Sequence, residues 1–272
     1  MDIERFSFGL FENESITSGF NKLEDITGGW QRGDLIMIAA PVRMGKTAFA
    51  ISMLRNNLLM SNKSIIWLST FLSANQFRRM FFCNHTGANN EDVIIGQVNG
   101  ILINEVHEIF LNNNFYFYDK PNLTNKLINQ ILDSLSIDAL PDYIIIDNLN
   151  YLEFITSEPY YIKEKQTNIK LLELKALARE FNIPIIVLFD CEFPDFKAKD
   201  EFCVDSVRLG FDITLVDTLC FIHRPEYYKI IENEKGESTL GKAFFLVAQS
   251  RYKTGFVLLE YNPLTFSFKQ SS

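Results

Sequence analysis

The sequence predicts an α/β protein with a mainly parallel sheet flanked by helices and with antiparallel strands at its C-terminal end. Up to about Asp217, short apolar runs alternate with longer amphipathic segments, which is typical of a parallel sheet covered on both faces. After Asp217, strand-like segments follow one another with little room for helices. No repeat, low-complexity stretch or Pro/Gly-rich linker divides the 272 residues, so we expect a single domain over 1–272, with 1–16 as an N-terminal extension.

The expected elements follow in chain order from the spacing of apolar residues. Short apolar runs predict buried strands over Leu35–Ala40, Ile65–Ser69, Phe115–Tyr118, Tyr143–Asp147 and Ile185–Phe189. Apolar residues at helical spacing predict helices over Thr47–Met60, Ala74–Phe82, Thr124–Ser136 and Asn168–Phe181. Ser73 is suited to cap the second of these helices. Closely spaced segments predict the antiparallel strands over Thr218–His223, Ala243–Ser250, Phe256–Tyr261 and Thr265–Lys269.

The composition excludes several classes of protein. Hydrophobic residues make up 47% of the chain and charged residues 22%, close to the globular average, so wholesale disorder is excluded. The net charge of −8 excludes a uniformly basic DNA-binding surface, although a local basic groove stays open. We expect no membrane contact, because no apolar run is long enough to span a bilayer and the N-terminus lacks the layout of a signal peptide. The four cysteines form no CxxC pair, so we expect reduced thiols and a cytoplasmic protein.

The strongest local signal is a candidate phosphate-binding loop between the first buried strand and the first long helix. Its residues are Ala40, Pro41, Val42, Arg43, Met44, Gly45, Lys46, Thr47 and Ala48. Backbone N–H groups of such a loop and of the helix N-terminus point at phosphates, Lys46 reaches the β- and γ-phosphates, and Thr47 ligates Mg²⁺. Ala40 stands where the general pattern has its first glycine. The alternative is a chance Gly-Lys-Thr, but the strand–loop–helix context favours a nucleotide site with Mg²⁺.

Two further residues could complete this site. Asp147 ends a buried apolar strand, where a carboxylate can hold Mg²⁺ through its water shell, although many such acids only cap the next helix. Together with the phosphate loop, the metal role is favoured. Arg251 follows a late strand and is either a surface charge or a finger that stabilises phosphate charge on a neighbouring subunit, and periodicity does not choose between these roles.

These residues belong to a longer stretch of similarity. The segments Thr17–Ile36 and Ala39–Phe49 resemble the motor domain of DnaB-type replicative DNA helicases, and the resemblance continues through Lys175–Pro184, Arg224–Tyr228 and Arg251. It implies a RecA-like P-loop NTPase core that binds ATP and Mg²⁺. It also implies a homo-oligomeric ring around single-stranded DNA, with ATP at subunit interfaces and Arg251 as the finger in trans. The role implied is DNA replication or the maintenance of a plasmid or mobile element. We expect no counterpart of the helical N-terminal domain of full-length helicases.

Several positions depart from the family pattern. Phe71 stands where the family places its catalytic glutamate, and no Asp or Glu occurs between Thr47 and Asn90 to replace it. Asp190 stands in place of a glutamine that senses the γ-phosphate, and Gln249 in place of a lysine near Arg251. A phenylalanine cannot orient or deprotonate the attacking water. We therefore expect nucleotide binding with weak or absent hydrolysis, in which Lys46 and Arg251 are the retained catalytic residues.

The resemblance also bears on DNA. The family threads DNA past loops that follow the strand ending here at Asp190. In this chain the segment from Asp190 to Asp217 is acidic, which works against phosphate contacts. A solvated acidic surface is the alternative to a DNA site, and the candidate DNA-binding residues are Lys197, Lys199 and Arg208.

Two hypotheses follow from the sequence. The chain is a working ATP-driven DNA helicase or translocase, or it is a hydrolysis-deficient nucleotide-binding RecA-like protein that acts as an assembly or regulatory partner. In either case we expect its self-association to be weak or nucleotide-dependent.

Overall fold

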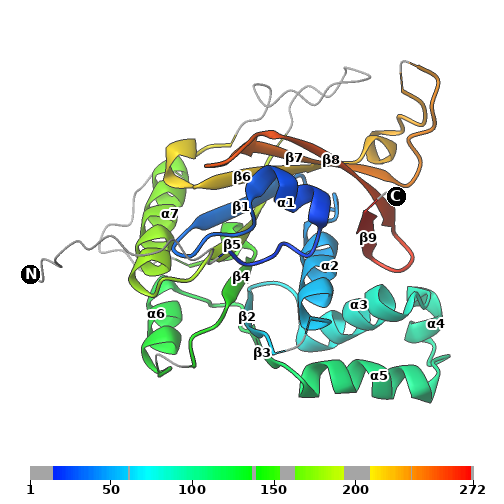
Figure 1. Ribbon diagram of the computed structural model, residues 1–272, viewed down its shortest axis with the longest axis horizontal. Helices are drawn as coiled ribbons and strands as arrows, with labels where there is room; N and C mark the ends of the chain where they lie inside the picture. The colour runs from blue at the N-terminus through cyan, green and yellow to red at the C-terminus, as the bar shows by residue number, and fades with distance from the viewer. Residues whose placement is uncertain are drawn as a thin grey trace, which may run out of the picture.

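A nine-stranded mixed sheet forms the centre of the computed structural model, which describes residues 15–60, 62–136, 139–153, 163–192, 209–233 and 235–270 (Figure 1). The strand order is β3-β2-β4-β5-β1-β6-β7-β8-β9. The strands are β1 (Leu35–Ala40), β2 (Ser64–Ser69), β3 (Asn114–Asp119), β4 (Tyr143–Asp147), β5 (Ile185–Asp190), β6 (Thr218–His223), β7 (Lys242–Gln249), β8 (Gly255–Asn262) and β9 (Ser267–Gln270). Strands β1 to β6 run parallel, whereas β7, β8 and β9 add antiparallel pairings.

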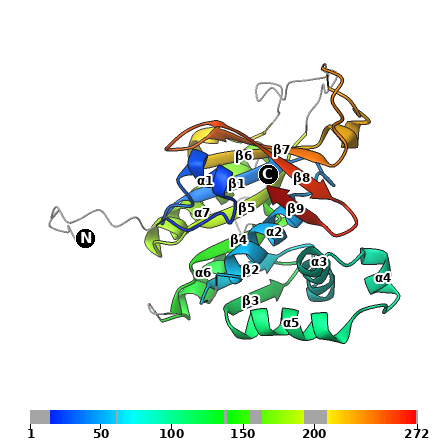
Figure 2. The ribbon, with the colours of Figure 1, turned by 45° about the vertical axis from the view of Figure 1, so that its right-hand side comes forward.

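Helices cover both faces of this sheet because its central strands are apolar on both sides. The helices are α1 (Asn21–Thr27), α2 (Lys46–Leu58), α3 (Ala74–Thr86), α4 (Asn90–Ile94), α5 (Gly100–Leu111), α6 (Asn125–Asp133) and α7 (Lys163–Glu180). Alternate residues of β1 join two separate cores: Ile36 and Ile38 pack with α2 and α3, whereas Leu35 and Met37 pack with α6 and α7. Figure 2 shows α3 and α5 beside β3, with α4 at the far end of these two helices.

Most of the expected elements are confirmed with small shifts at their ends. Strands β1, β4 and β6 have the predicted bounds, and Ser73 caps α3 in a capping box with Gln76. One expectation was wrong in part: Thr218–His223 is parallel to β1 and only its other side pairs with an antiparallel strand. Ile16, assigned to the N-terminal extension, is buried and pairs with Trp30. Helices α1, α4 and α5 had no counterpart in the sequence prediction.

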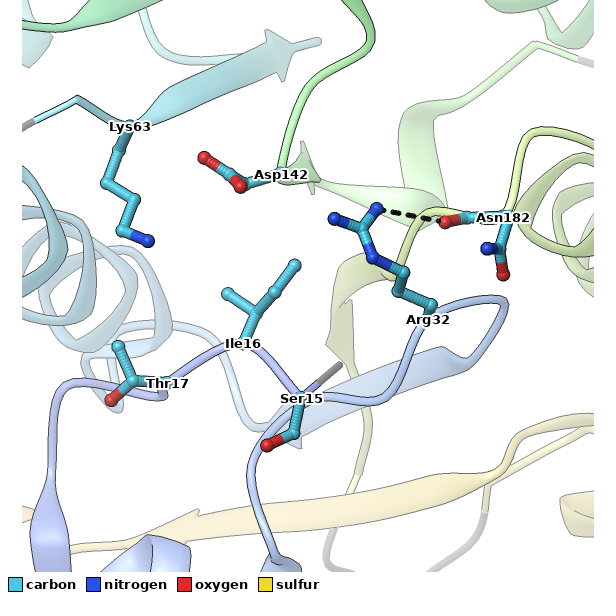
Figure 3. A pocket seen from close by; sticks show the side chains of 7 residues that line it. All are labelled: Ser15, Ile16, Thr17, Arg32, Lys63, Asp142 and Asn182. Atoms are coloured by element: carbon cyan, nitrogen blue, oxygen red, sulfur yellow. Dashed lines mark hydrogen bonds between the residues drawn. The ribbon is translucent and has the colours of Figure 1, made fainter. Parts of the chain in front are cut away.

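Because β1 to β6 are parallel, their carboxyl ends lie together along one side of the sheet, here called the carboxyl edge, and their amino ends along the other, here called the amino edge. The carboxyl edge carries the phosphate loop and the acids that end β4 and β5. The amino edge carries a pocket of about 620 Å³ lined by residues that precede several strands, among them Arg32, Lys63, Asp142 and Asn182 (Figure 3). Arg32 donates to the carbonyl of Asn182 there at 3.3 Å. Within the described part of the chain, no helix is long and apolar enough to cross a membrane.

Candidate functional site

The loop between β1 and α2 has the backbone of a phosphate-binding site. Its turn closes with a hydrogen bond from the Met44 N–H to the Pro41 carbonyl at 3.3 Å. Gly45 has φ of 106°, and a Cβ atom there would lie 3.0 Å from Cζ of Phe268, so the position requires glycine. No side chain caps the N-terminus of α2. Because the first N–H groups of a helix lack intrahelical partners, this end of α2 is suited to an anionic ligand.

Lys46 lies folded over this loop. Its Nζ donates to the carbonyls of Ala40 and Pro41 at 2.8 and 3.0 Å and pairs with Oδ1 of Asp190 at 2.7 Å. Its side chain is only 6% exposed, and a buried ammonium needs such partners. Asp190 reaches Lys46 because β5 lies beside β1 in parallel register, with Asp190 opposite Ala40.

Thr47 and Asp147 meet across the same edge. The Thr47 hydroxyl donates to Oδ2 of Asp147 at 3.0 Å, so the first turn of α2 and the end of β4 are joined. The pKa of Asp147 is raised to about 6, mainly by burial and also by the charge of Asp190, against the hydrogen bond from Thr47 and the charge of Lys46, which lower it. Asp147 is therefore largely ionised at neutral pH. A hydroxyl and a carboxylate are the hard oxygen donors that Mg²⁺ prefers, so these two residues fit the ion that the sequence predicts.

Replacing Asp147 by Asn is expected to stabilise the nucleotide-free protein at pH 8. The native pKa of about 6 lies above the ordinary value of 3.8, so the native state holds the proton more strongly than the unfolded state. The free energy of unfolding therefore falls as the pH rises from about 4 to about 6. The loss due to Asp147 is about 3 kcal/mol in all at pH 8, and about half of that is already lost at pH 5. Thermal unfolding of Asp147→Asn and parent between pH 5 and 8 measures the difference, with the exposed Asp133→Asn as control. A variant less stable than the parent at pH 8 would contradict the burial cost.

Phe71 occupies the expected position of the catalytic acid, just beyond the carboxyl end of β2. Its ring is 79% exposed and stacks on Tyr151, with centroids 6.0 Å apart and planes 21° apart. Tyr151 belongs to a short 3₁₀ helix, Leu149–Tyr151, that follows β4. The side chain at position 71 is thus apolar and open to solvent, at the same carboxyl edge of the sheet as the phosphate loop.

Arg251 lies at the amino edge of the sheet, opposite the phosphate loop. Strand β7 runs antiparallel to β6, so the residues after Gln249 meet the N-terminal ends of β1 and β6. The guanidinium pairs with Asp34 at 2.8 Å and with Asp217 at 2.6 Å, and it is 62% exposed. Lys175 also contacts Asp217. An arginine at this edge is distant from the phosphate loop of its own chain, and only a second copy could bring a phosphate loop to it.

Some of the other residues that the sequence singled out for the site are described in the structure, and others are not. Gln249 donates to the Val216 carbonyl at 2.7 Å, at the amino edge. The DNA-binding candidates Lys197, Lys199 and Arg208 lie outside the described residues. Backbone positions of the phosphate loop, namely Ala40, Pro41, Val42, Arg43, Met44, Gly45 and Ala48, lie together at the carboxyl edge.

Sequence reasoning missed two groups beside the phosphate loop. Asn150 clamps the backbone of Asp190: its Nδ2 donates to the Asp190 carbonyl at 3.0 Å, and its Oδ1 accepts from the Asp190 N–H at 2.7 Å. The buried Arg224 lies 4.0 Å above the Tyr261 ring, which packs on the Phe268 ring that faces Gly45. In the sequence, Arg224–Tyr228 stood out only as part of the family resemblance, and nothing marked Asn150.

Comparisons with known proteins identify relatives of this chain. A family model described as "DnaB-like helicase C terminal domain" matches residues 15–270. The chain is 28% identical over 225 residues to "Replicative DNA helicase DnaB" of Geobacillus stearothermophilus, covering 80% of this chain and 49% of the relative. It is 26% identical over 267 residues to "Probable plasmid replicative DNA helicase" of Chlamydia psittaci, covering 94% of this chain and 55% of the relative. The chain thus spans about half the length of the curated relatives it matches.

A solved structure supports the same relationship at the level of the fold. A DnaB-like replicative helicase, described together with its interactions with primase, superposes with a TM-score of 0.82 at 20% sequence identity. The superposition covers 95% of this chain and 62% of that chain. The fold is therefore shared even where the sequences differ.

Proposed function

Because the chain belongs to the family of DnaB-like helicase C-terminal domains and has their RecA-like ATPase fold, we propose that it is a nucleotide-binding helicase motor domain with an impaired hydrolytic site. The observation that carries the proposal is the joining of Thr47 to Asp147 beside Lys46 at the carboxyl edge. These three groups are the lysine, hydroxyl and carboxylate that a phosphate loop uses. The aromatic side chain at position 71 supports the impairment.

The proposed binding mode uses the chain's own donors. The N–H groups of the loop and of the uncapped α2 N-terminus hold the phosphates, and Lys46 turns from its loop carbonyls toward them. Thr47 and Asp147 hold Mg²⁺, which supplies charge stabilisation to the phosphates when bound. Phe71 offers no basic atom that could accept a proton from the attacking water. Binding without efficient turnover is the result.

A second function has an observation in its favour. The loss of both the acid at Phe71 and the sensing amide at Asp190 favours a nucleotide-dependent assembly or regulatory partner over an autonomous helicase. The name of the Chlamydia psittaci relative refers to a plasmid, and this supports plasmid maintenance as the setting. Single-stranded DNA is the partner we propose for the helicase role.

The proposal is tested by calorimetric titration of the parent protein in the presence of Mg²⁺. The ligands are ADP and a non-hydrolysable ATP analogue. We expect saturable binding of nucleotide at one site per chain, which weakens when the metal is chelated because Thr47 and Asp147 then lose their ligand. The proposal fails if neither nucleotide binds.

Self-association is expected to depend on nucleotide, because Arg251 lies at the edge opposite the phosphate loop and would act on a second copy. Sedimentation velocity at several concentrations, with and without nucleotide, should show larger species only in its presence. Arg251→Ala should remove this effect, whereas Arg78→Ala, which deletes an exposed arginine on α3, should leave it unchanged. A stable oligomer formed without nucleotide, and unaffected by Arg251→Ala, would rule out this role.

A further inference from the structure

Asp190 is held in place on both sides. Its carboxylate lies 2.7 Å from Nζ of Lys46, and its backbone N–H and carbonyl are both bound by the side chain of Asn150. The pairing with β1 fixes it opposite Ala40. Lys46, Asn150 and strand β1 therefore each fix the position of Asp190, so its contact with Lys46 is part of the structure of the site.

The contact fills the bonding capacity of Lys46. An ammonium group has three donors, and those of Lys46 contact the carbonyls of Ala40 and Pro41 and the carboxylate of Asp190. The Asp190 side chain is 19% exposed, so the pair is shielded from water on most sides. Asp147 is close enough for the charge of Asp190 to raise its pKa. Of these two carboxylates, that of Asp190 is the one in contact with the Lys46 ammonium.

We propose that Asp190 makes this site selective for nucleoside diphosphates over triphosphates, an inference that rests on the nucleotide-binding function proposed above. A phosphate loop holds the β-phosphate mainly by backbone N–H groups, and these are unaffected by Asp190. The γ-phosphate depends on the lysine ammonium, which here already has a carboxylate in contact. A γ-phosphate that reaches Nζ therefore comes within a few ångströms of Asp190, where like charges repel strongly in a shielded site.

The charge rather than the shape of Asp190 carries the selectivity. An amide in its place keeps a hydrogen-bonding group at the end of β5 and removes the repulsion. Asp190→Asn has nearly the same size, and its backbone can keep both contacts to Asn150. Asp190→Gln restores the residue type that the family resemblance implies at this position. Asp119→Asn is the matched control: Asp119 also ends a parallel strand, β3, but β2 and β4 separate that strand from β5, and its carboxylate accepts from the Ala74 N–H.

The test is the affinity of each protein for ADP and for a non-hydrolysable ATP analogue, measured by calorimetry with Mg²⁺. For the parent, we expect ADP to bind at least about tenfold more tightly than the analogue. Asp190→Asn and Asp190→Gln should tighten the analogue by about tenfold and change ADP by less than about threefold, which corresponds to about 1.4 kcal/mol of selectivity. Asp119→Asn should match the parent for both ligands.

The outcomes separate this inference from the function on which it rests. Equal affinity of the parent for the two nucleotides overturns the selectivity while leaving the nucleotide site intact, and this measurement needs no variant. Equal tightening of both ligands by Asp190→Asn overturns it too, because the effect would then not concern the γ-phosphate. If Asp190→Asn bound the ATP analogue more weakly than the parent does, the carboxylate would be favouring triphosphate binding, through the metal or through water. That result also overturns the proposed selectivity. If no protein binds either nucleotide, the proposed function fails with it.

Discussion

Lys46→Ala is expected to lower nucleotide affinity at least about a hundredfold, the largest binding effect of any single substitution in this chain. Among the described residues, Lys46 is the only lysine whose ammonium donates to the loop carbonyls of Ala40 and Pro41. Its removal leaves the Asp190 carboxylate without the ammonium that pairs with it at 2.7 Å. The change therefore removes an attraction and leaves a repulsion, and two factors of ten in affinity correspond to about 2.8 kcal/mol.

Calorimetry with ADP and Mg²⁺ measures this loss. Because Lys46→Ala also unpairs Asp190, thermal unfolding must show that the variant is folded at the temperature of the titration. The double variant Lys46→Ala with Asp190→Asn removes both members of the pair and tests binding without an unpaired charge. Lys63→Ala, which removes a lysine at the opposite edge of the sheet, is the control. Parent-like affinity in Lys46→Ala would show that the phosphates bind elsewhere.

Phe71→Glu is expected to raise ATP turnover by about 10²-fold or more, because a positioned general base contributes about 10²–10⁴-fold. The position is favourable for a charged side chain, since Phe71 is 79% exposed and a carboxylate there stays hydrated. The stack on Tyr151 is lost, at a cost to stability of about 1 kcal/mol or less. The gain requires Lys46 to turn from its loop carbonyls and Asp190 toward the phosphates, while Thr47 and Asp147 hold the metal.

The matched control for this gain is Phe71→Gln, which has the shape of glutamate without a basic oxygen. Steady-state phosphate release should rise in Phe71→Glu and not in Phe71→Gln. Addition of Arg251→Ala to Phe71→Glu should reduce the gain if a neighbouring copy supplies the finger, although effects within one site do not simply add. Equal rates in the Glu and Gln variants would contradict the assignment of position 71 to the base.

The sheet was predictable because each strand is a local signal. Runs such as Leu35–Ala40 and Tyr143–Asp147 are apolar throughout, which is typical of a strand buried on both faces. The direction of Thr218–His223 was not predictable, because one strand can be parallel to one neighbour and antiparallel to the other. Helix α5 was missed although its signal is present in the sequence: Leu102, Val106 and Ile109 recur at helical spacing and are half-buried in the structure.

The candidate site shows the same division between local and long-range information. The loop, its glycine and the first turn of α2 come from adjacent residues and could be identified directly. The contact of Lys46 with Asp190, and the clamp by Asn150, depend on strand order and register that no single segment encodes. Similarly, the intramolecular pairing of Arg251 with Asp34 and Asp217 follows from the direction of β7 and became visible only in the structure.

The central claim, a nucleotide-binding motor domain with impaired hydrolysis, is tested most directly by the steady-state ATP turnover of the parent protein. The assay is run with saturating Mg²⁺-ATP, with and without single-stranded DNA, at a protein concentration that permits self-association. With Phe71 at the base position, the expected rate lies far below about 1 s⁻¹ in both conditions, under the usual enzyme range. DNA-stimulated turnover of about 1 s⁻¹ or more would show that another group activates the water, and would contradict the claim.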